Sequence, residues 1–109
     1  MQKTIVMGFF DFIFKNKKKM VGEFIEKEAI VLDVRTKAEY SIGAIQGSKN
    51  IPLQILSSNI SDIKKLNKPI ITCCASGMRS GTAASILKQN GIEAINGGGW
   101  QRLNQLLAN

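Results

Sequence analysis

One short segment of the chain collects the residue types that could carry out covalent chemistry. Within seven positions it places a cysteine, a glycine, an arginine and a serine: Cys74, Ala75, Ser76, Gly77, Met78, Arg79 and Ser80. A thiol between a buried strand and a helix meets inward-pointing backbone N–H groups and the helix dipole, which favour its thiolate. The segment therefore predicts a nucleophilic Cys74 in an anion-binding loop, with Arg79 holding an anionic substrate and Ser80 donating a hydrogen bond.

The two adjacent cysteines are expected to differ in role. Cysteine is among the most buried residue types, so a purely structural Cys74 is the alternative to a reactive one. The nearby Gly77, Arg79 and Ser80 favour reactivity, because a core cysteine has no need of them. Successive strand residues face opposite sides, so Cys73 is expected to pack under a neighbouring helix. Neighbouring cysteines make a poor disulfide framework, which indicates a reducing compartment, and we expect a cytoplasmic protein.

The composition excludes several classes of function. The chain has 109 residues and no histidine, which rules out Ser-His and Cys-His catalytic pairs and imidazole ligands for zinc. We expect no metal and no cofactor. The net charge is +7, but residues 1–20 hold five lysines and one aspartate, and the other cations are mostly scattered. This pattern lacks the basic stripe of a nucleic-acid binder, so we expect no nucleic-acid partner.

The rest of the chain alternates apolar strand-like runs with helical patterns. Strands are predicted at Ile30–Val34, around Ser48–Ile51, and at Ile70–Cys74 and Ile92–Asn96. Helices are predicted at Met20–Ala29, Lys37–Ser41, Leu53–Leu66 (one broken helix or two short ones), Arg79–Asn90 and Trp100–Leu107, with a turn at Gly97–Gly99. The alternation predicts an α/β domain whose central parallel β-sheet is flanked by helices on both faces. Ligands bind such sheets at the carboxyl ends of the strands, where Cys74 falls.

The N-terminal residues form an apolar and basic extension, residues 1–19, before a domain at 20–109. Residues 4–14 are apolar and residues 15–19 carry four lysines, but the apolar stretch is too short to span a bilayer. We favour an ordinary extension that docks or frays, and the alternative is weak peripheral membrane contact through residues 4–19. Met7 is an alternative start.

Four motifs, taken in order, resemble those of the single-domain rhodanese-like sulfurtransferases. They are Leu32–Arg35 (LDVR) with Glu39-Tyr40, residues 43–53 (GAIQGSKNIPL), the Cys74–Ser80 loop, and Gly97–Trp100 (GGGW). The resemblance covers residues 24–107 and therefore most of the chain. Ala44 departs from the usual histidine of this family and Ser48 from the usual alanine, so one side-chain contact to the pocket would be absent.

The resemblance implies a sulfurtransferase that moves a sulfane sulfur through a Cys74 persulfide. The donor would be a small anion such as thiosulfate, and the acceptor would be cyanide or a thiol. Asp33 and Arg35 would organise the loops, with an Arg35–Glu39 ion pair, and Trp100 would pack below the rim of the pocket. We expect a monomer. The alternatives are a carrier that exchanges sulfur with other proteins, a non-catalytic rhodanese-like binding module and, less favoured, a Cys-loop phosphatase or arsenate reductase, whose loops have five residues between cysteine and arginine where this chain has four.

Overall fold

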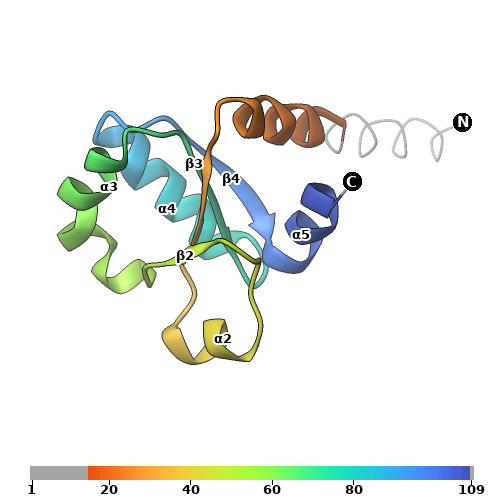
Figure 1. Ribbon diagram of the computed structural model, residues 1–109. Coiled ribbons are helices and arrows are strands. Elements are labelled where there is room, and N and C mark those ends of the chain that lie inside the picture. Colours follow the sequence, from red (N-terminus) through yellow and green to blue (C-terminus); the bar gives the residue numbers. More distant parts are fainter. Residues whose placement is uncertain (1–14, 109) are drawn as a thin grey trace, which may run out of the picture.

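The computed structural model describes residues 15–108 and is built on one parallel sheet. The strands are β1 (Ile30–Asp33), β2 (Lys49–Asn50), β3 (Ile70–Cys74) and β4 (Ala94–Gly99), in the spatial order β2-β1-β3-β4 (Figure 1). All paired strands run parallel. Their carboxyl ends therefore meet at one edge of the sheet, which gathers residues from distant parts of the sequence.

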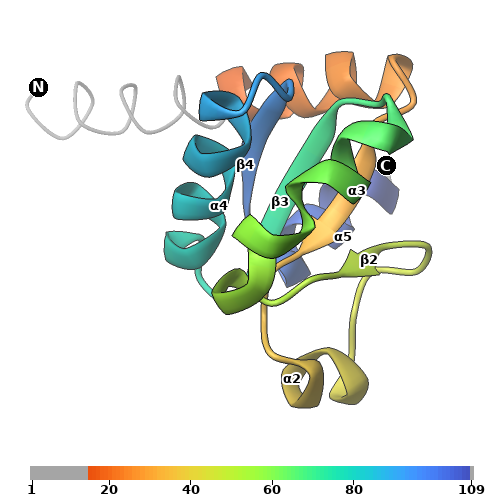
Figure 2. The same ribbon diagram turned by 90° about the vertical axis from the view of Figure 1, so that its left-hand side faces the viewer.

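Helices cover both faces of the sheet, which confirms the predicted α/β architecture. One face is covered by η1 (Leu53–Asn59, a 3-10 helix), α3 (Ile60–Leu66) and α4 (Met78–Gln89), and the opposite face by α5 (Trp100–Ala108) and a helix over residues 15–26 (Figure 2). The short helix α2 (Lys37–Ile42) connects β1 to β2. The two faces bury separate apolar clusters: Leu56, Ile63 and Leu87 lie in one, Phe24 and Leu103 in the other.

β3 lies at the centre of the fold, and every one of its five residues is buried. The run Ile70-Ile71-Thr72 is β-branched and packs well on both faces of a pleated sheet. Its hydrogen-bonded neighbours are β1 on one side and β4 on the other. The chain leaves this strand at Cys74 and enters α4 four residues later, so the sheet's most buried strand delivers the predicted nucleophile.

The predicted turn at Gly97–Gly99 is wrong, because β4 continues as a strand through Gly99. The strands can pair this closely because glycine has no side chain. A Cβ on Gly97 would lie 2.7 Å from the Thr72 carbonyl oxygen and 2.7 Å from a methyl carbon of Ile71. The register shifts between Thr72 and Cys74, so that Cys74 pairs with Gly99. The glycine run therefore brings β4 against the start of the Cys74 loop.

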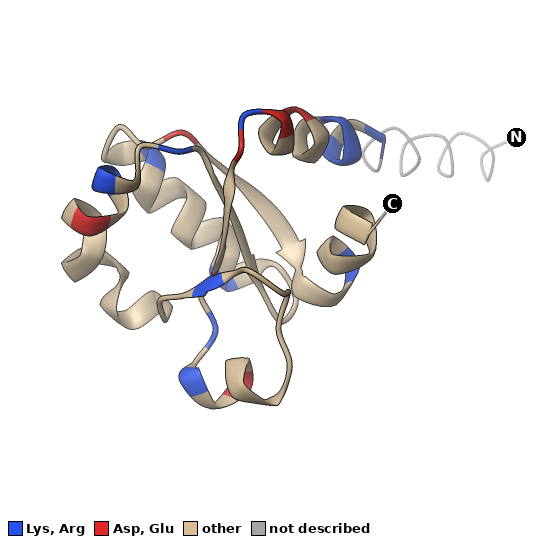
Figure 3. Ribbon diagram, in the orientation of Figure 1, with Lys and Arg blue, Asp and Glu red and all other residues tan. Residues whose placement is uncertain are grey.

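The first described helix crosses the predicted boundary between residues 19 and 20. Figure 3 shows its lysines near its start and its glutamates in the later part. Its apolar side, with Val21 and Phe24, packs on the sheet. The apolar segment 4–14 and Met7 lie outside the described residues. Within residues 15–108, no helix is both long and apolar enough to cross a membrane.

Candidate active site

The sulfur of Cys74 lies in a small cradle of hydrogen-bond donors between β3 and α4. The backbone N–H of Gly77 donates to the sulfur at an N–S distance of 3.0 Å, and that of Ser80 at 3.3 Å. The Ser80 hydroxyl oxygen lies 3.3 Å from the same sulfur. Gly77 has a φ of +101°, a left-handed conformation that a residue without a side chain adopts at little cost. The arrangement suits an anion on the sulfur.

Two opposing effects set the pKa of Cys74. Burial is the largest single influence and raises the pKa, because it disfavours the charged thiolate. Hydrogen bonds from the Ser80 hydroxyl and from the backbone of Ser80, Gly77 and Ser76 lower it. The donors together outweigh burial, so the pKa of Cys74 lies below that of an ordinary cysteine. The predicted reactivity of this thiol thus has a physical basis in its donors.

Cys73 faces the opposite side of the sheet, as the alternation of strand side chains predicts. It packs with apolar side chains that include Val21, Phe24 and Leu103, from the two helices on that face. Burial, and after it the neighbouring Asp33 carboxylate, raises the pKa of Cys73 to about 12. The thiol of Cys73 is therefore protonated across the physiological range and is not poised to react.

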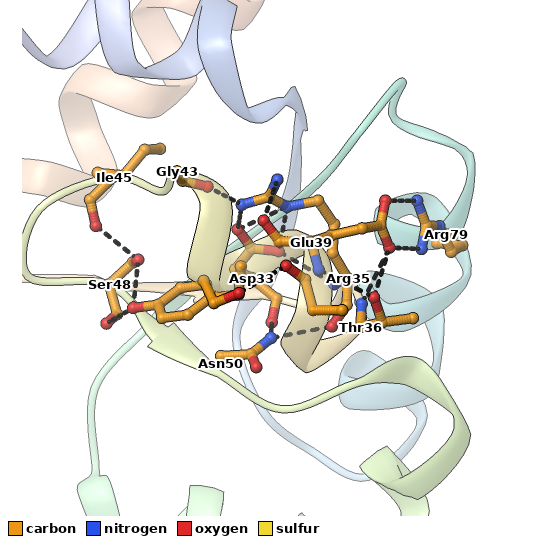
Figure 4. Close-up of polar contacts among 12 residues, drawn as sticks. Asp33, Arg35, Thr36, Glu39, Gly43, Ile45, Ser48, Asn50 and Arg79 are labelled. Carbon is orange, nitrogen blue, oxygen red and sulfur yellow. Dashed lines mark hydrogen bonds and ion pairs between the residues drawn. The ribbon is translucent and has the colours of Figure 1, made fainter.

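Arg79 lies at the rim of the loop and forms an ion pair that the sequence did not predict. Its Nη1 and Nη2 donate to the two carboxylate oxygens of Glu39 at 2.8 and 3.0 Å (Figure 4). The Arg79 guanidinium, together with backbone and side-chain donation from Thr36, lowers the pKa of Glu39 to about 2. The expected Arg35–Glu39 ion pair is wrong: Arg35 reaches only the backbone oxygen of Glu39, at 3.5 Å.

The fold explains this exchange of partners. Glu39 is the third residue of α2, where its carboxylate accepts the backbone N–H of Thr36 in a capping box. The capping box turns the carboxylate away from Arg35 and towards α4. Arg35 in turn is held by Asp33, whose carboxylate accepts from its Nε and Nη2 at 2.7 to 3.0 Å.

Asp33 and Arg35 lie below the site as a buried pair that ties loops together. Their side chains are 0% and 5% exposed, and Arg35 also donates to the Gly43 carbonyl at 2.7 Å. The Trp100 ring lies against the Arg35 guanidinium, 4.6 Å from ring centroid to Cζ. Asn50 completes the cluster by donating to the carbonyls of Asp33 and Arg35. The geometry is that of a loop-organising pair and does not bring these side chains to the Cys74 sulfur.

Asn96 is a site residue that the sequence analysis missed. It lies on β4, accepts from the Ser80 hydroxyl at 2.7 Å and donates to the Gly77 carbonyl at 3.0 Å. It thereby contacts both residues that surround the Cys74 sulfur, Gly77 through its carbonyl and Ser80 through its hydroxyl. The one signal in the sequence was a polar residue between the apolar Ala94-Ile95 and the glycine run, which is an unusual position for an amide in a buried strand.

The remaining loop residues are exposed to solvent. Ala75, Ser76 and Met78 are exposed, and Met78 is 81% exposed. Ser76, Gly77 and Met78 also line a cavity of about 430 Å³, whose other lining residues include Lys17, Asn96, Arg102 and Leu106. A somewhat larger cavity, of about 510 Å³, lies at the opposite edge of the sheet and contains no cysteine. Within residues 15–108, no three Cys, Asp or Glu side chains gather in a way that could hold a metal ion.

Comparison with known proteins assigns this architecture to a family. The model of the Rhodanese-like domain matches residues 17–105. The YqhL protein of Bacillus subtilis is 38% identical over 69 residues, which are 63% of this chain and 54% of that protein. The thiosulfate sulfurtransferase GlpE of Pseudoalteromonas translucida is 35% identical over 77 residues, which cover 67% of this chain and 70% of the relative. The chain thus spans about half to two-thirds of the length of these relatives.

A solved structure shows the same fold. The rhodanese-like domain protein of Staphylococcus aureus superposes with a TM-score of 0.62 and is 33% identical. The match covers 69% of this chain and 72% of that one.

Proposed function

This chain belongs to the Rhodanese-like domain family, and on that premise we propose that it is a sulfurtransferase whose sulfur-carrying residue is Cys74. The observation that carries the proposal is the set of polar groups around the Cys74 sulfur: two backbone N–H groups that donate to it at 3.0 and 3.3 Å, and a hydroxyl oxygen at 3.3 Å. These donors lower the pKa of a buried thiol, which is what a sulfur nucleophile needs. The sulfurtransferase names of relatives such as GlpE agree with this chemistry.

In the first half-reaction the Cys74 thiolate attacks the outer sulfur of a donor such as thiosulfate. A new bond forms between the two sulfurs, the S–S bond inside thiosulfate breaks, and sulfite leaves with the bonding electron pair. The cysteine is left as a persulfide anion with the same total charge as before. The N–H groups of Gly77 and Ser80 would stabilise that anion as they do the thiolate.

In the second half-reaction an acceptor removes the outer sulfur. Cyanide attacks it, the S–S bond of the persulfide breaks, thiocyanate leaves, and the electron pair returns to the Cys74 thiolate. A thiol acceptor in its thiolate form would react in the same way and leave as a persulfide. In this step the Cys74 sulfur leaves as a thiolate. A thiol with a lowered pKa is a better leaving group, so the lowered pKa of Cys74 also favours the second half-reaction.

Arg79 has a supporting part in this proposal. Its guanidinium is ion-paired to Glu39 at the rim, so we propose that it attracts and orients an anionic donor from a fixed position. The cavity that Ser76 and Met78 line is also lined by the cations Lys17 and Arg102. These positive charges would favour a small anion, or an acidic group on a protein donor or acceptor.

A phosphatase or arsenate reductase is less supported by the geometry. The loop has four residues between Cys74 and Arg79, one fewer than the loops of those enzymes, and is therefore a smaller cradle for a tetrahedral anion. A non-catalytic binding module would have no use for a thiol with a lowered pKa. A carrier that receives sulfur from another protein uses the same Cys74 chemistry and differs only in its donor.

We propose a cytoplasmic location, in keeping with two free cysteines.

Mass spectrometry of the intact protein tests the proposal. Incubation with thiosulfate should add one sulfur, roughly 32 Da, and cyanide should remove it with formation of thiocyanate. Peptide mapping should place the added sulfur on Cys74. An unmodified mass after thiosulfate, with no transfer to cyanide, would contradict thiosulfate as donor, and sulfur found on Cys73 would contradict the assignment of the nucleophile.

A further inference from the structure

The side chain of Asn96 is held in one orientation by the main chain on both sides. Its oxygen accepts the backbone N–H of Gly98 at 2.9 Å, and its nitrogen donates to the carbonyl of Gly77 at 3.0 Å. A rotated amide would set its nitrogen against an N–H and its oxygen against a carbonyl, and would lose both bonds. The amide oxygen therefore faces Ser80.

This orientation decides where the Ser80 hydroxyl sends its proton. The hydroxyl oxygen lies 2.7 Å from the Asn96 amide oxygen, which can only accept, so Ser80 donates to Asn96. A hydroxyl has one proton, and this one is not directed at the Cys74 sulfur, 3.3 Å away on the other side. What faces the sulfur is a lone pair, which is suited to accept from a thiol and unsuited to stabilise an anion.

The packing around Ser80 leaves its hydroxyl no other partner that accepts its proton. Ser80 is fully buried, and its backbone carbonyl accepts the hydroxyl of Thr72 at 2.7 Å. Arg79 on α4 and Cys73 on β3 interact electrostatically with Cys74, and Lys17 and Arg102 line the cavity beside the loop. None of these groups accepts a hydrogen bond from the Ser80 hydroxyl. The possible acceptors of its proton are therefore Asn96 and Cys74.

We propose that Asn96 is a positioning residue that competes with Cys74 for the single proton of the Ser80 hydroxyl. The inference rests on the proposed function, in which the Cys74 sulfur must become an anion. In the thiol state Cys74 donates to Ser80 and Ser80 donates to Asn96. On ionisation the thiol proton leaves to solvent, the sulfur keeps the electron pair, and the hydroxyl turns from Asn96 to the sulfur. The Asn96 oxygen retains the N–H of Gly98, so nothing is left unpaired.

The proposal predicts a sign that a merely structural role would not give. Asn96→Leu removes an interaction that exists only in the thiol state, so the midpoint of iodoacetamide alkylation at Cys74 should fall, by roughly half a pH unit or more. If Asn96 only holds the loop in place, its loss loosens the donors, and the midpoint should rise towards that of a free cysteine. A rise or an unchanged midpoint overturns the proposal.

A double variant identifies the route of the effect. In a Ser80→Ala background, the further change Asn96→Leu should leave the midpoint unchanged, because the shared proton is gone. A fall of the same size in both backgrounds overturns the proposal. Should Asn96→Leu fail to fold, Asn96→Ala gives the same test with a smaller side chain and the same expected sign.

Asn90→Leu is the matched control. Asn90 donates its side chain to the Ile86 carbonyl at the other end of α4, and its loss should leave the midpoint where it is in the parent protein. Alkylation needs no sulfur donor, so this experiment tests the competition for the Ser80 proton separately from the proposed sulfurtransferase function. Absence of sulfur transfer with the predicted fall in the midpoint would reject the proposed function and keep the proton competition.

Discussion

Two neighbouring cysteines on one strand show how the surroundings set the pKa of a buried thiol. Cys73 and Cys74 are 0% and 1% exposed, so burial does not distinguish them. Cys73 lies among apolar side chains and near a carboxylate, and its pKa is raised to about 12. Cys74 faces the backbone donors of a turning loop, and its pKa is lowered. The difference teaches that donors aimed at the sulfur decide its chemistry, and that strand alternation alone sends one cysteine to each environment.

The largest expected effect is loss of transfer at only one of the two sulfurs. Cys74→Ala should abolish thiosulfate:cyanide transfer, because no other described thiol has a lowered pKa. Cys73→Ala should keep transfer within about threefold, a factor under 1 kcal/mol in activation free energy. Thiocyanate formation measures both. Substantial residual activity in Cys74→Ala would break the comparison between the two sides of β3.

The same contrast should be visible in the unmodified chain by chemical labelling. At neutral pH iodoacetamide should label Cys74 at least about a thousandfold faster than Cys73, since only the thiolate reacts and the pKa of Cys73 is raised to about 12 while that of Cys74 is lowered. Peptide mass spectrometry over a time course gives both rates. Comparable labelling of the two positions in the folded protein would mean that the donors on Cys74 do not control its reactivity.

A third prediction separates stability from chemistry on the Cys73 side. Arg35→Met leaves the buried Asp33 carboxylate without its partner, so the free energy of unfolding should drop by about 3 kcal/mol. Urea unfolding followed by circular dichroism measures the loss. The alkylation midpoint of Cys74 in the folded variant should change little, and a large shift would show that the Asp33–Arg35 pair acts on the sulfur as well as on the loops.

Ser80→Ala should have a moderate effect on the Cys74 side. Removal of the hydroxyl takes a donor from the thiolate, so the alkylation midpoint should rise by about one pH unit. Thr82→Ala, two residues further along α4 and exposed, is the control and should leave the midpoint unchanged. An unchanged midpoint in Ser80→Ala would assign the whole effect to the backbone donors.

The smallest effect concerns the rim ion pair. The pKa of Glu39 is lowered to about 2 by Arg79 and Thr36, so the pair stabilises the folded chain above the ordinary glutamate pKa and loses that contribution as pH falls towards 2. Thermal unfolding should therefore show a slightly smaller decrease in Tm between about pH 4.5 and 2 for Glu39→Gln than for the parent protein. Parallel curves for the two proteins would mean that the pair contributes nothing to stability.

The sequence predicted what local patterns control. The strands at Ile30 and Ile70 follow from apolar β-branched runs, and α4 follows from its helical spacing and its asparagine-glycine end. Partner choices were harder, because they depend on where an element points after folding. The family resemblance implies a pair of Glu39 with Arg35, but the capping box of α2 turns Glu39 to Arg79, forty residues away.

The glycine run and Asn96 were missed for a related reason. Three successive glycines are typical of a turn, and only contact with β3 shows that they continue a strand. The role of Asn96 depends on Gly77 and Ser80 in the segment after β3, and no spacing within β4 encodes these two partners. Sequence reasoning therefore located the Cys74 loop, while the side chains that contact the groups around the sulfur became visible only in three dimensions.

Gly77 and Gly98 lie back to back, and this limits how the site can be redesigned. A Cβ on Gly77 would lie 3.3 Å from the Gly98 Cα, and both residues have positive φ, at +101° and +86°. The two positions form a single steric unit: a side chain on Gly77 would push the strand and the loop apart and tilt the Gly77 N–H away from the sulfur. Ser76 and Met78 are exposed and carry no such restriction. Room for a bulkier sulfur donor can be engineered at those two positions, while the floor of the loop has to stay as it is.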